Sequence, residues 1–420
     1  MATLDPLPLK SDKWTKLRQS GCMLVDKTYA LGALVRRYSS CYLARPHGMG
    51  KTMLCTQLEE LFAHGVGAFE GFDIYDTWPE HKTYLVIRVS LGENKRVTVG
   101  NYEEWLQRRI IQAYVSAGLL AQGEIMVQEK LKDLLPKLTL LTTDREVVFL
   151  IDDWDAQIMH YLHDKAACDS IEQLWGQFTD WLNCKVSPHF TLITGTMSYS
   201  TSQVVLLDCE PLNNDSNFDD ILGITPEELT TYYWPYITKA ASRLELSTSL
   251  LVAQIESYYL GFNFARGEPN PVYSPLELNQ FFAPLAQPMP TVPVFAPYWF
   301  DSRDHFGLTH WAKGAFNTSE YLVQQINQNF GEPIGVNPEE LTVCYGPYIT
   351  ETARRSGEQE WELINDIEDI YLKFNFTLDT PRSDLNPLDL NLFFEQLTID
   401  SESILWPADH DDIDHTFCTA

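Results

Sequence analysis

The stretch that decides the fold is LARPHGMGKT, residues 43–52, which lies between an apolar run and the helical stretch Lys51–Phe62. A glycine-containing loop at a strand-to-helix junction directs several backbone N–H groups and the positive end of the helix at one point. Phosphate oxygens bind at such a point. We expect Lys51 to reach the β- and γ-phosphates of a nucleotide and Thr52 to hold Mg²⁺.

The loop departs from the strict phosphate-loop pattern GxxxxGK[ST], because Arg45 stands where that pattern has glycine. A chance GKT in a loop is the alternative interpretation, and its position after a strand and before a helix favours phosphate binding. The predicted nucleotide-binding residues are Arg45, Pro46, His47, Gly48, Met49, Gly50, Lys51, Thr52 and Thr194.

A second apolar run, residues 147–151, ends in acidic residues. Ligands of open α/β sheets bind at the carboxyl ends of the strands, so Asp152 is predicted to orient Mg²⁺ together with Thr52, as a Walker B aspartate does. Asp153 is the predicted catalytic residue that polarises the attacking water; a solvated acid at a strand end is the alternative. Asp155 is the rival base, since it would share a face with Asp153 if the strand continued.

A third run, residues 190–194, ends in threonines. Thr194 or Thr196 is placed to sense the γ-phosphate or to position water between Asp152 and the loop. A strand threonine without such a role is the alternative.

Short apolar runs alternate with amphipathic stretches from Gly21 to about Thr196. Runs without polar alternation are typical of strands buried on both faces, and strand–helix alternation predicts a parallel sheet wrapped by helices. The runs are 41–44, 84–89, 147–151 and 190–194. The fold class predicted is therefore α/β, a P-loop NTPase-type parallel sheet, followed by a mainly helical region.

The helical region contains an internal repeat with a constant offset of 112 positions. Residues 224–230 (ITPEELT) recur as 336–342 (VNPEELT), and 259–264 (YLGFNF) recur as 371–376 (YLKFNF). A constant offset across loops indicates a duplicated folding unit. The predicted domains are 1–215 for the P-loop domain, 216–286 and 328–397 for the two helical units, 287–327 for an aromatic- and proline-rich connection, and 398–420 for an acidic tail.

The 420 residues carry 58 acidic side chains against 30 lysines and arginines, a net charge of −28. Such a surface repels phosphate backbones and anionic membranes, so neither nucleic acid nor membrane is an expected partner. The sequence has no apolar run long enough to span a bilayer and no amino-terminal secretory signal. Eight irregularly spaced cysteines without a CxxC pair favour reduced thiols and a cytoplasmic location.

Several blocks resemble the bacterial AAA-ATPase-like proteins that carry RPxxxGKT in place of a full Walker A motif. The blocks, in order, are VDKT at 25–28, RP at 45–46 with GKT at 50–52, FEGFDI at 69–74, LIDDWD at 150–155, ITG at 193–195, ILGITPEE at 221–228 and VYSP at 272–275. The resemblance covers roughly residues 10–285. It implies a P-loop fold that binds ATP and Mg²⁺.

Three departures from that family matter. The family's acidic pair is Asp-Glu, whereas this chain has Asp152-Asp153, which shortens the reach toward water and implies slow hydrolysis. The arginine-rich loop of the family loses positive charge here. Many members continue into a nuclease domain, which this sequence does not show.

Two functional hypotheses follow from the sequence. One is an ATPase that engages an unidentified protein partner through its duplicated units; the other is a scaffold that binds nucleotide without hydrolysis or binds none. A guanine-specific enzyme is disfavoured, because no NKxD segment follows the third strand. The sequence leaves open the oligomeric state and the source of an arginine finger, for which the candidates are Arg88, Arg108, Arg109 and Arg243.

Overall fold

The structure is a computed structural model of the chain. It describes residues 4–9, 13–45, 48–92, 97–128, 130–161, 165–195, 209–212, 215–263, 270–287, 289–295, 349–350, 353, 359–361 and 364. The predictions for Pro46, His47, Thr196, the acidic tail and most of the second helical unit lie outside these residues.

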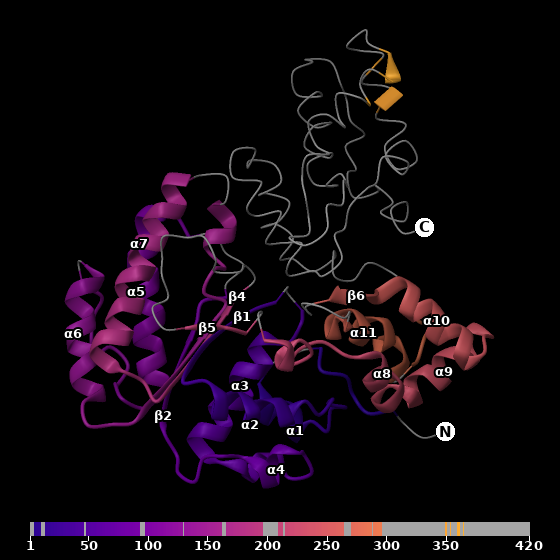
Figure 1. Ribbon diagram of the computed structural model, residues 1–420, viewed down its shortest axis with the longest axis horizontal. Coiled ribbons are helices and arrows are strands. Elements are labelled where there is room, and N and C mark those ends of the chain that lie inside the picture. Colours follow the sequence, from indigo (N-terminus) through magenta and orange to yellow (C-terminus); the bar gives the residue numbers. More distant parts are fainter. Residues whose placement is uncertain are drawn as a thin grey trace.

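A five-stranded sheet forms the centre of the first part of the chain (Figure 1). Its strands are β1 Ser40–Ala44, β2 Leu85–Ser90, β3 Val147–Asp152, β4 Phe190–Gly195 and β5 Glu210–Pro211. They lie in the order β2-β3-β4-β1-β5, and every neighbouring pair is parallel. The predicted parallel sheet is confirmed, with each of the four expected strands within one residue of its predicted bounds.

Helices cover both faces of the sheet (Figure 1). One face packs on α5 Val99–Ser116, α6 Leu131–Thr142 and α7 Lys165–Trp181, and the other on α1 Trp14–Gln19, α2 Thr28–Arg37, α3 Lys51–His64 and α4 Ile74–Thr77. Successive side chains of a strand point to opposite faces, so Phe149 packs toward α5–α7 and Leu150 toward α3. The same alternation places Asp152 on the α3 face.

Short helical turns connect these elements. They are η1 Val66–Phe69, η2 Ile158–Tyr161, the π-helical turn η3 Leu182–Val186, η5 Ser216–Phe218 and η6 Ala283–Ala286.

A helical unit with its own core follows the sheet domain (Figure 1). It consists of α8 Pro226–Tyr232, α9 Trp234–Leu244, α10 Thr248–Tyr259, the hairpin β6 Leu260–Asn263 and β7 Pro271–Tyr273, and α11 Pro275–Phe282. The amino-terminal residues 4–9 pack on this core: Leu7 is buried in it, and the Tyr236 hydroxyl donates to the carbonyl of Asp5 at 2.6 Å. Segments that precede and follow the sheet domain in the sequence thus share one core.

A capping box begins α8. The Glu228 N–H donates to Thr225 Oγ1 at 3.2 Å, and Glu228 Oε2 accepts from the Thr225 N–H at 2.8 Å. Pro226 at the first helical position has no N–H to leave unsatisfied.

Few residues of the second helical unit are described. Ile349 and Ala353 are helical and buried, as are Ile237 and Ala241, which lie 112 positions earlier. The duplication and the domain boundaries stay predictions. In the described part of the chain, the structure contains no helix long and apolar enough to cross a membrane.

We expect Gly195→Ala to destabilise the sheet domain, because a Cβ there would lie 2.5 Å from Nε1 of Trp154 and 3.1 Å from Cγ of Asp155. Overpacking of this kind costs about 1–3 kcal/mol. Gly176→Ala is the matched control: it lies inside α7 with nothing within 4 Å of its Cβ position, and should stabilise by about 0.5–1 kcal/mol. Urea unfolding of both variants measures the difference; equal midpoints would contradict the close contact.

A candidate nucleotide-binding site

The site lies at the carboxyl ends of β1, β3 and β4, where α3 begins. Because β4 lies between β1 and β3 in the sheet, Thr194 stands beside Leu43 in the register and within reach of Asp152. The Thr194 hydroxyl donates to Asp152 Oδ1 at 2.8 Å and accepts from the Asp153 N–H at 3.3 Å. Thr194 therefore connects the strand that leads into the loop with the acidic strand end.

The loop between β1 and α3 uses glycine where its backbone turns left-handed. Gly48 has a φ of +80° and Gly50, which precedes α3, a φ of +101°. Side chains with a Cβ are strained in that region, whereas glycine enters it freely. The first N–H groups of a helix have no carbonyl acceptor within the helix, and such groups commonly bind anions.

Lys51 joins the loop to the acidic strand end. Its side chain is 6% exposed. Its Nζ donates to the carbonyl of Arg45 at 2.9 Å and lies 3.6 Å from Oδ1 of Asp153. The ammonium group of Lys51 is thus buried between a carbonyl and a carboxylate.

Asp152 is a buried carboxylate, 1% exposed. Burial, and to a lesser extent the charge of Asp153, raise its pKa from 3.8 to about 6; hydrogen bonds from the hydroxyls of Thr194 and Thr52 and the charge of Lys51 act in the opposite direction. Burial disfavours the charged form because a low-dielectric interior solvates it poorly. A divalent cation at Asp152 would relieve that cost.

The two candidate bases differ in their surroundings. β3 ends at Asp152, and Asp153 has a left-handed φ of +54°, so the continued strand that would place Asp153 and Asp155 on one face is not formed. The Asp153 carboxylate is 30% exposed, beside Lys51 and Gly92. Asp155 is buried against Gly195. Solvent access therefore favours Asp153 over Asp155 as the residue that meets water.

The Arg45 side chain donates to backbone carbonyls and does not have the position expected of a phosphate ligand. Its buried guanidinium donates to the carbonyls of Ala44 at 2.8 Å, Phe218 at 3.2 Å and Asp219 at 3.5 Å. Burial lowers its pKa from 12.5 to about 9, while the charge of Asp219 acts against that shift. A role for Arg45 in phosphate binding rests on its backbone, because the side chain joins β1 to the segment that follows β5.

The sequence did not predict that the helical unit contacts the loop. The Leu276 N–H donates to the carbonyl of Gly48 at 3.3 Å, and a Cβ on Gly48 would lie 2.8 Å from that of Leu276. A Cβ on Gly223 would lie 3.0 Å from Cε of Met49. The blocks ILGITPEE and VYSP were the signal for this contact, since they contain Gly223 or directly precede Leu276.

Three of the arginine-finger candidates contact neighbouring side chains of the sheet domain. Arg88 is engaged by Glu59, with 2.7 Å between Nε and Oε2, and Arg108 by Glu104 four residues earlier on α5. The Arg109 guanidinium lies over the ring of Trp105.

The residues present fit ATP and Mg²⁺. Two left-handed glycines, a helix amino terminus and a buried lysine are suited to a polyphosphate. The Thr52 hydroxyl and the Asp152 carboxylate meet each other, and they offer the oxygen ligands that Mg²⁺ takes when it is shared with phosphates and water.

Comparison with known proteins agrees with this chemistry. Residues 8–205 match the model of the AAA-ATPase-like family, described as "Predicted AAA-ATPase". The match covers just under half of the chain. It supports a nucleotide-binding P-loop protein, and we refer to this part of the chain as the AAA-ATPase-like domain.

A curated relative also matches beyond the AAA-ATPase-like domain. It is an uncharacterized protein of the vnfD 5′ region in Azotobacter chroococcum mcd 1, 22% identical over 303 residues, which cover 70% of this chain and 54% of that protein. The chain thus spans about half the length of this relative.

Two solved structures are similar at low scores. A Walker-type ATPase of Pyrococcus abyssi has 12% identity over 89% of each chain and a TM-score of 0.35. Cdc6p of Pyrobaculum aerophilum has 13% identity over 95% of this chain and 97% of its own, with a TM-score of 0.31. The fold of the AAA-ATPase-like domain is assigned from its own strand order and register.

Because the pKa of Asp152 is raised, the stability of the protein without nucleotide or metal should depend on pH. The folded pKa of about 6 exceeds the ordinary value. The contribution of this group to stability is therefore fully present below about pH 4 and lost as the pH rises through about 6. Asp152→Asn cannot ionise, so it should stabilise the apo protein at pH 7.5, by on the order of 2–3 kcal/mol, and have no such effect near pH 4.

Thermal unfolding in EDTA at several pH values measures this difference between wild type and Asp152→Asn. A variant less stable than wild type at pH 7.5 would show that the fold favours the charged carboxylate. Thr191→Val, a threonine of the same strand as Thr194 that is not part of the site, controls for general effects of changes in the sheet.

Proposed function

We propose that this chain binds ATP with Mg²⁺ and hydrolyses it slowly. The observation that carries the proposal is the meeting of Lys51, Thr52, Thr194 and Asp152 around the amino terminus of α3. A basic residue, two hydroxyls and a buried carboxylate at the carboxyl edge of a parallel sheet are the groups that a phosphate chain and its cation require.

Each residue would act through a group already in place. Backbone N–H groups at the start of α3 would bind phosphate oxygens, and Lys51 would exchange the Arg45 carbonyl and Asp153 for the β- and γ-phosphates. Thr52 and Asp152 would hold Mg²⁺, which neutralises charge on the phosphates when bound. Asp153, released from Lys51, would orient water, with its backbone held by the Thr194 hydroxyl.

Slow turnover is proposed because Asp153 is one methylene shorter than the glutamate typical of the family. A carboxylate misplaced by about 1 Å can lower a rate by about 10²-fold. We also propose that the helical units engage a protein partner in the cytoplasm. The exposed Trp234 and Leu250 of the first unit support a partner surface, and the described cysteines, none of which is in a disulfide, support a reducing compartment.

One observation favours the second candidate, a nucleotide-binding scaffold without hydrolysis. Asp153 lies 3.6 Å from Lys51, and a carboxylate that stays with the lysine is unavailable to water. The two functions differ in turnover and share the binding site.

Lys51→Ala should lower the affinity for ATP at least tenfold, because a charged hydrogen-bond partner contributes about 1.5–3 kcal/mol. Calorimetric titration of ATP into wild type and variant measures it. Lys82→Ala removes a lysine of the surface pair with Glu146 and should leave affinity unchanged. Equal affinity of wild type and a folded Lys51→Ala protein would refute the site.

Asp153→Glu should raise steady-state ATP hydrolysis, and Asp153→Asn should lower it, because a positioned general base contributes about 10²–10⁴-fold. Phosphate release by the wild type, both variants and Asp155→Asn is the measurement. Full activity of Asp153→Asn together with an inactive Asp155→Asn would assign the base to Asp155. If none of the four proteins hydrolyses ATP while Lys51-dependent binding persists, the scaffold function holds.

A further inference from the structure

We propose that Lys27 and Glu228 form a latch that positions the helical unit against the phosphate loop, so that ATP affinity depends on a pair that lies outside the loop. This inference rests on the proposed function and adds a mode of regulation of the same site. Lys27 belongs to the VDKT block, residues 25–28, to which the nucleotide chemistry gives no role.

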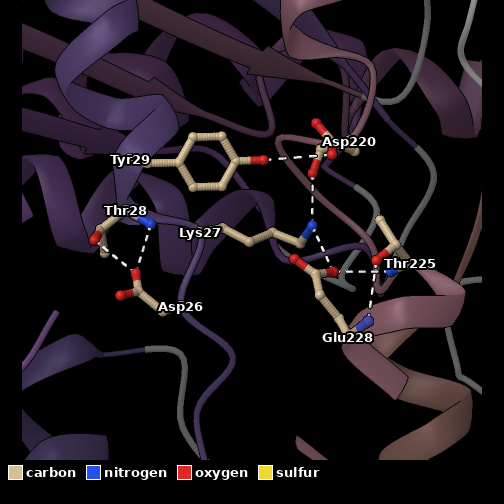
Figure 2. A network of polar contacts seen from close by, with 7 residues as sticks. All are labelled: Asp26, Lys27, Thr28, Tyr29, Asp220, Thr225 and Glu228. Atoms are coloured by element: carbon tan, nitrogen blue, oxygen red, sulfur yellow. Dashed lines mark hydrogen bonds and ion pairs between the residues drawn. The ribbon is translucent and has the colours of Figure 1, made fainter. Parts of the chain in front are cut away.

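The latch crosses between the AAA-ATPase-like domain and the helical unit (Figure 2). Lys27 Nζ lies 2.7 Å from Oε2 of Glu228 and donates to the carbonyl of Asp220 at 2.8 Å. The two side chains are only 13% and 16% exposed, so solvent and salt screen the pair less than an exposed one. The Tyr29 hydroxyl adds a hydrogen bond to Oδ2 of Asp220 at 3.3 Å.

The remaining polar residues of the VDKT block fix Lys27 to its own domain. Asp26 Oδ1 accepts from the N–H of Thr28 at 2.9 Å and from its hydroxyl at 2.7 Å, which holds the start of α2. Asp26 Oδ2 accepts from the Asp73 N–H at 2.8 Å, and the Thr28 hydroxyl oxygen accepts from the Ile74 N–H at 3.1 Å. The backbone around Lys27 is thus held by α2 and the start of α4.

Glu228 connects the latch to the first turn of α8. The oxygen that meets Lys27, Oε2, is the same one that accepts from the Thr225 N–H in the capping box (Figure 2). A change at Lys27 therefore acts directly on the residue that precedes α8.

The segment just before α8 packs on the phosphate loop. Ile224 pairs with Tyr273 through two backbone hydrogen bonds, of 3.0 and 2.8 Å. Gly223 beside them packs against Val272 and Met49, and the Leu276 N–H holds the Gly48 carbonyl. From Lys27 to Gly48 the chain of contacts runs through Glu228, Thr225, the Ile224–Tyr273 pair and Leu276.

The consequence is a linkage between docking of the helical unit and phosphate binding. The loop residues that would wrap phosphate, Gly48 to Gly50, are those that the helical unit contacts. With the latch intact, the helical unit contacts Gly48 to Gly50 before ATP arrives, and a preorganised site binds more tightly. Linkage is reciprocal, so bound ATP must stabilise docking by the same factor.

The test compares ATP affinity by calorimetry, with Mg²⁺, in variants of the full chain. Lys27→Met removes the charge, and Glu228→Gln removes the charge while keeping an oxygen for the capping box. We expect each to weaken ATP binding about fivefold to tenfold, within the usual range of coupling between sites. The double variant should be no weaker than either single one, because both act through one pair.

Two variants should leave the affinity within about twofold of wild type. Lys27→Arg keeps the charge and the donors. Lys82→Met breaks the pair with Glu146, whose two side chains are 53% and 59% exposed. The Lys82–Glu146 separation of 2.6 Å is close to the 2.7 Å between Lys27 and Glu228. A loss in Lys82→Met equal to that in Lys27→Met would overturn the latch as the cause.

A second measurement needs no variant of the latch. Amide hydrogen exchange of residues 226–263 and 270–286 should slow when ATP is added to wild type, and should be unchanged by ATP in Lys51→Ala. An exchange rate in wild type that does not respond to ATP would overturn the linkage even if Lys27→Met failed to fold.

The outcomes separate this inference from the proposed function. Unchanged affinity in folded Lys27→Met and Glu228→Gln, with affinity lost in Lys51→Ala, overturns the latch and leaves ATP binding standing. Absence of ATP binding by wild type overturns both.

Discussion

The position of β4 between β1 and β3 is the constraint on which the site depends. It sets Thr194 beside the strand that leads into the phosphate loop and within 2.8 Å of Asp152. The Thr194 hydroxyl also holds the backbone of Asp153, whose carboxylate faces Lys51. One threonine at the end of a buried strand thus positions Asp152, the carboxylate proposed to hold Mg²⁺, and the backbone of Asp153, whose side chain faces the lysine. These contacts hold Asp152 in place although burial makes its charged form unfavourable.

The helical unit packs directly on the sheet domain. Its segments 222–224 and 272–276 pack on Gly48 and Met49, and its first helix is joined to α2 through Lys27 and Glu228. The guanidinium of Arg45, which binds the carbonyls of Phe218 and Asp219, attaches β1 to the connecting segment as well. The loop is therefore held by the sheet on one side and by the helical unit on the other.

The sequence predicted the strands because short apolar runs and the side chains at their ends are local properties. The apolar runs 147–151 and 190–194 predicted β3 and β4, and GKT at 50–52 predicted the start of α3. The orientation of Arg45 was not predictable, since two of its partners are the backbone carbonyls of Phe218 and Asp219, more than 170 residues away, which no residue type reveals. The contrast between Asp153 and Asp155 depends on a left-handed φ at Asp153 that ends the strand, and aspartate gives only a weak signal for that conformation.

The most direct measurement of the central claim is a crystal structure of the chain with Mg²⁺ and a non-hydrolysable ATP analogue. The triphosphate should lie at the backbone N–H groups of residues 48–52, with Lys51 Nζ moved from the Arg45 carbonyl to a phosphate oxygen and with Thr52 and Asp152 holding Mg²⁺. A nucleotide bound elsewhere, or Lys51 still bonded to the Arg45 carbonyl and Asp153 beside a bound nucleotide, would contradict it.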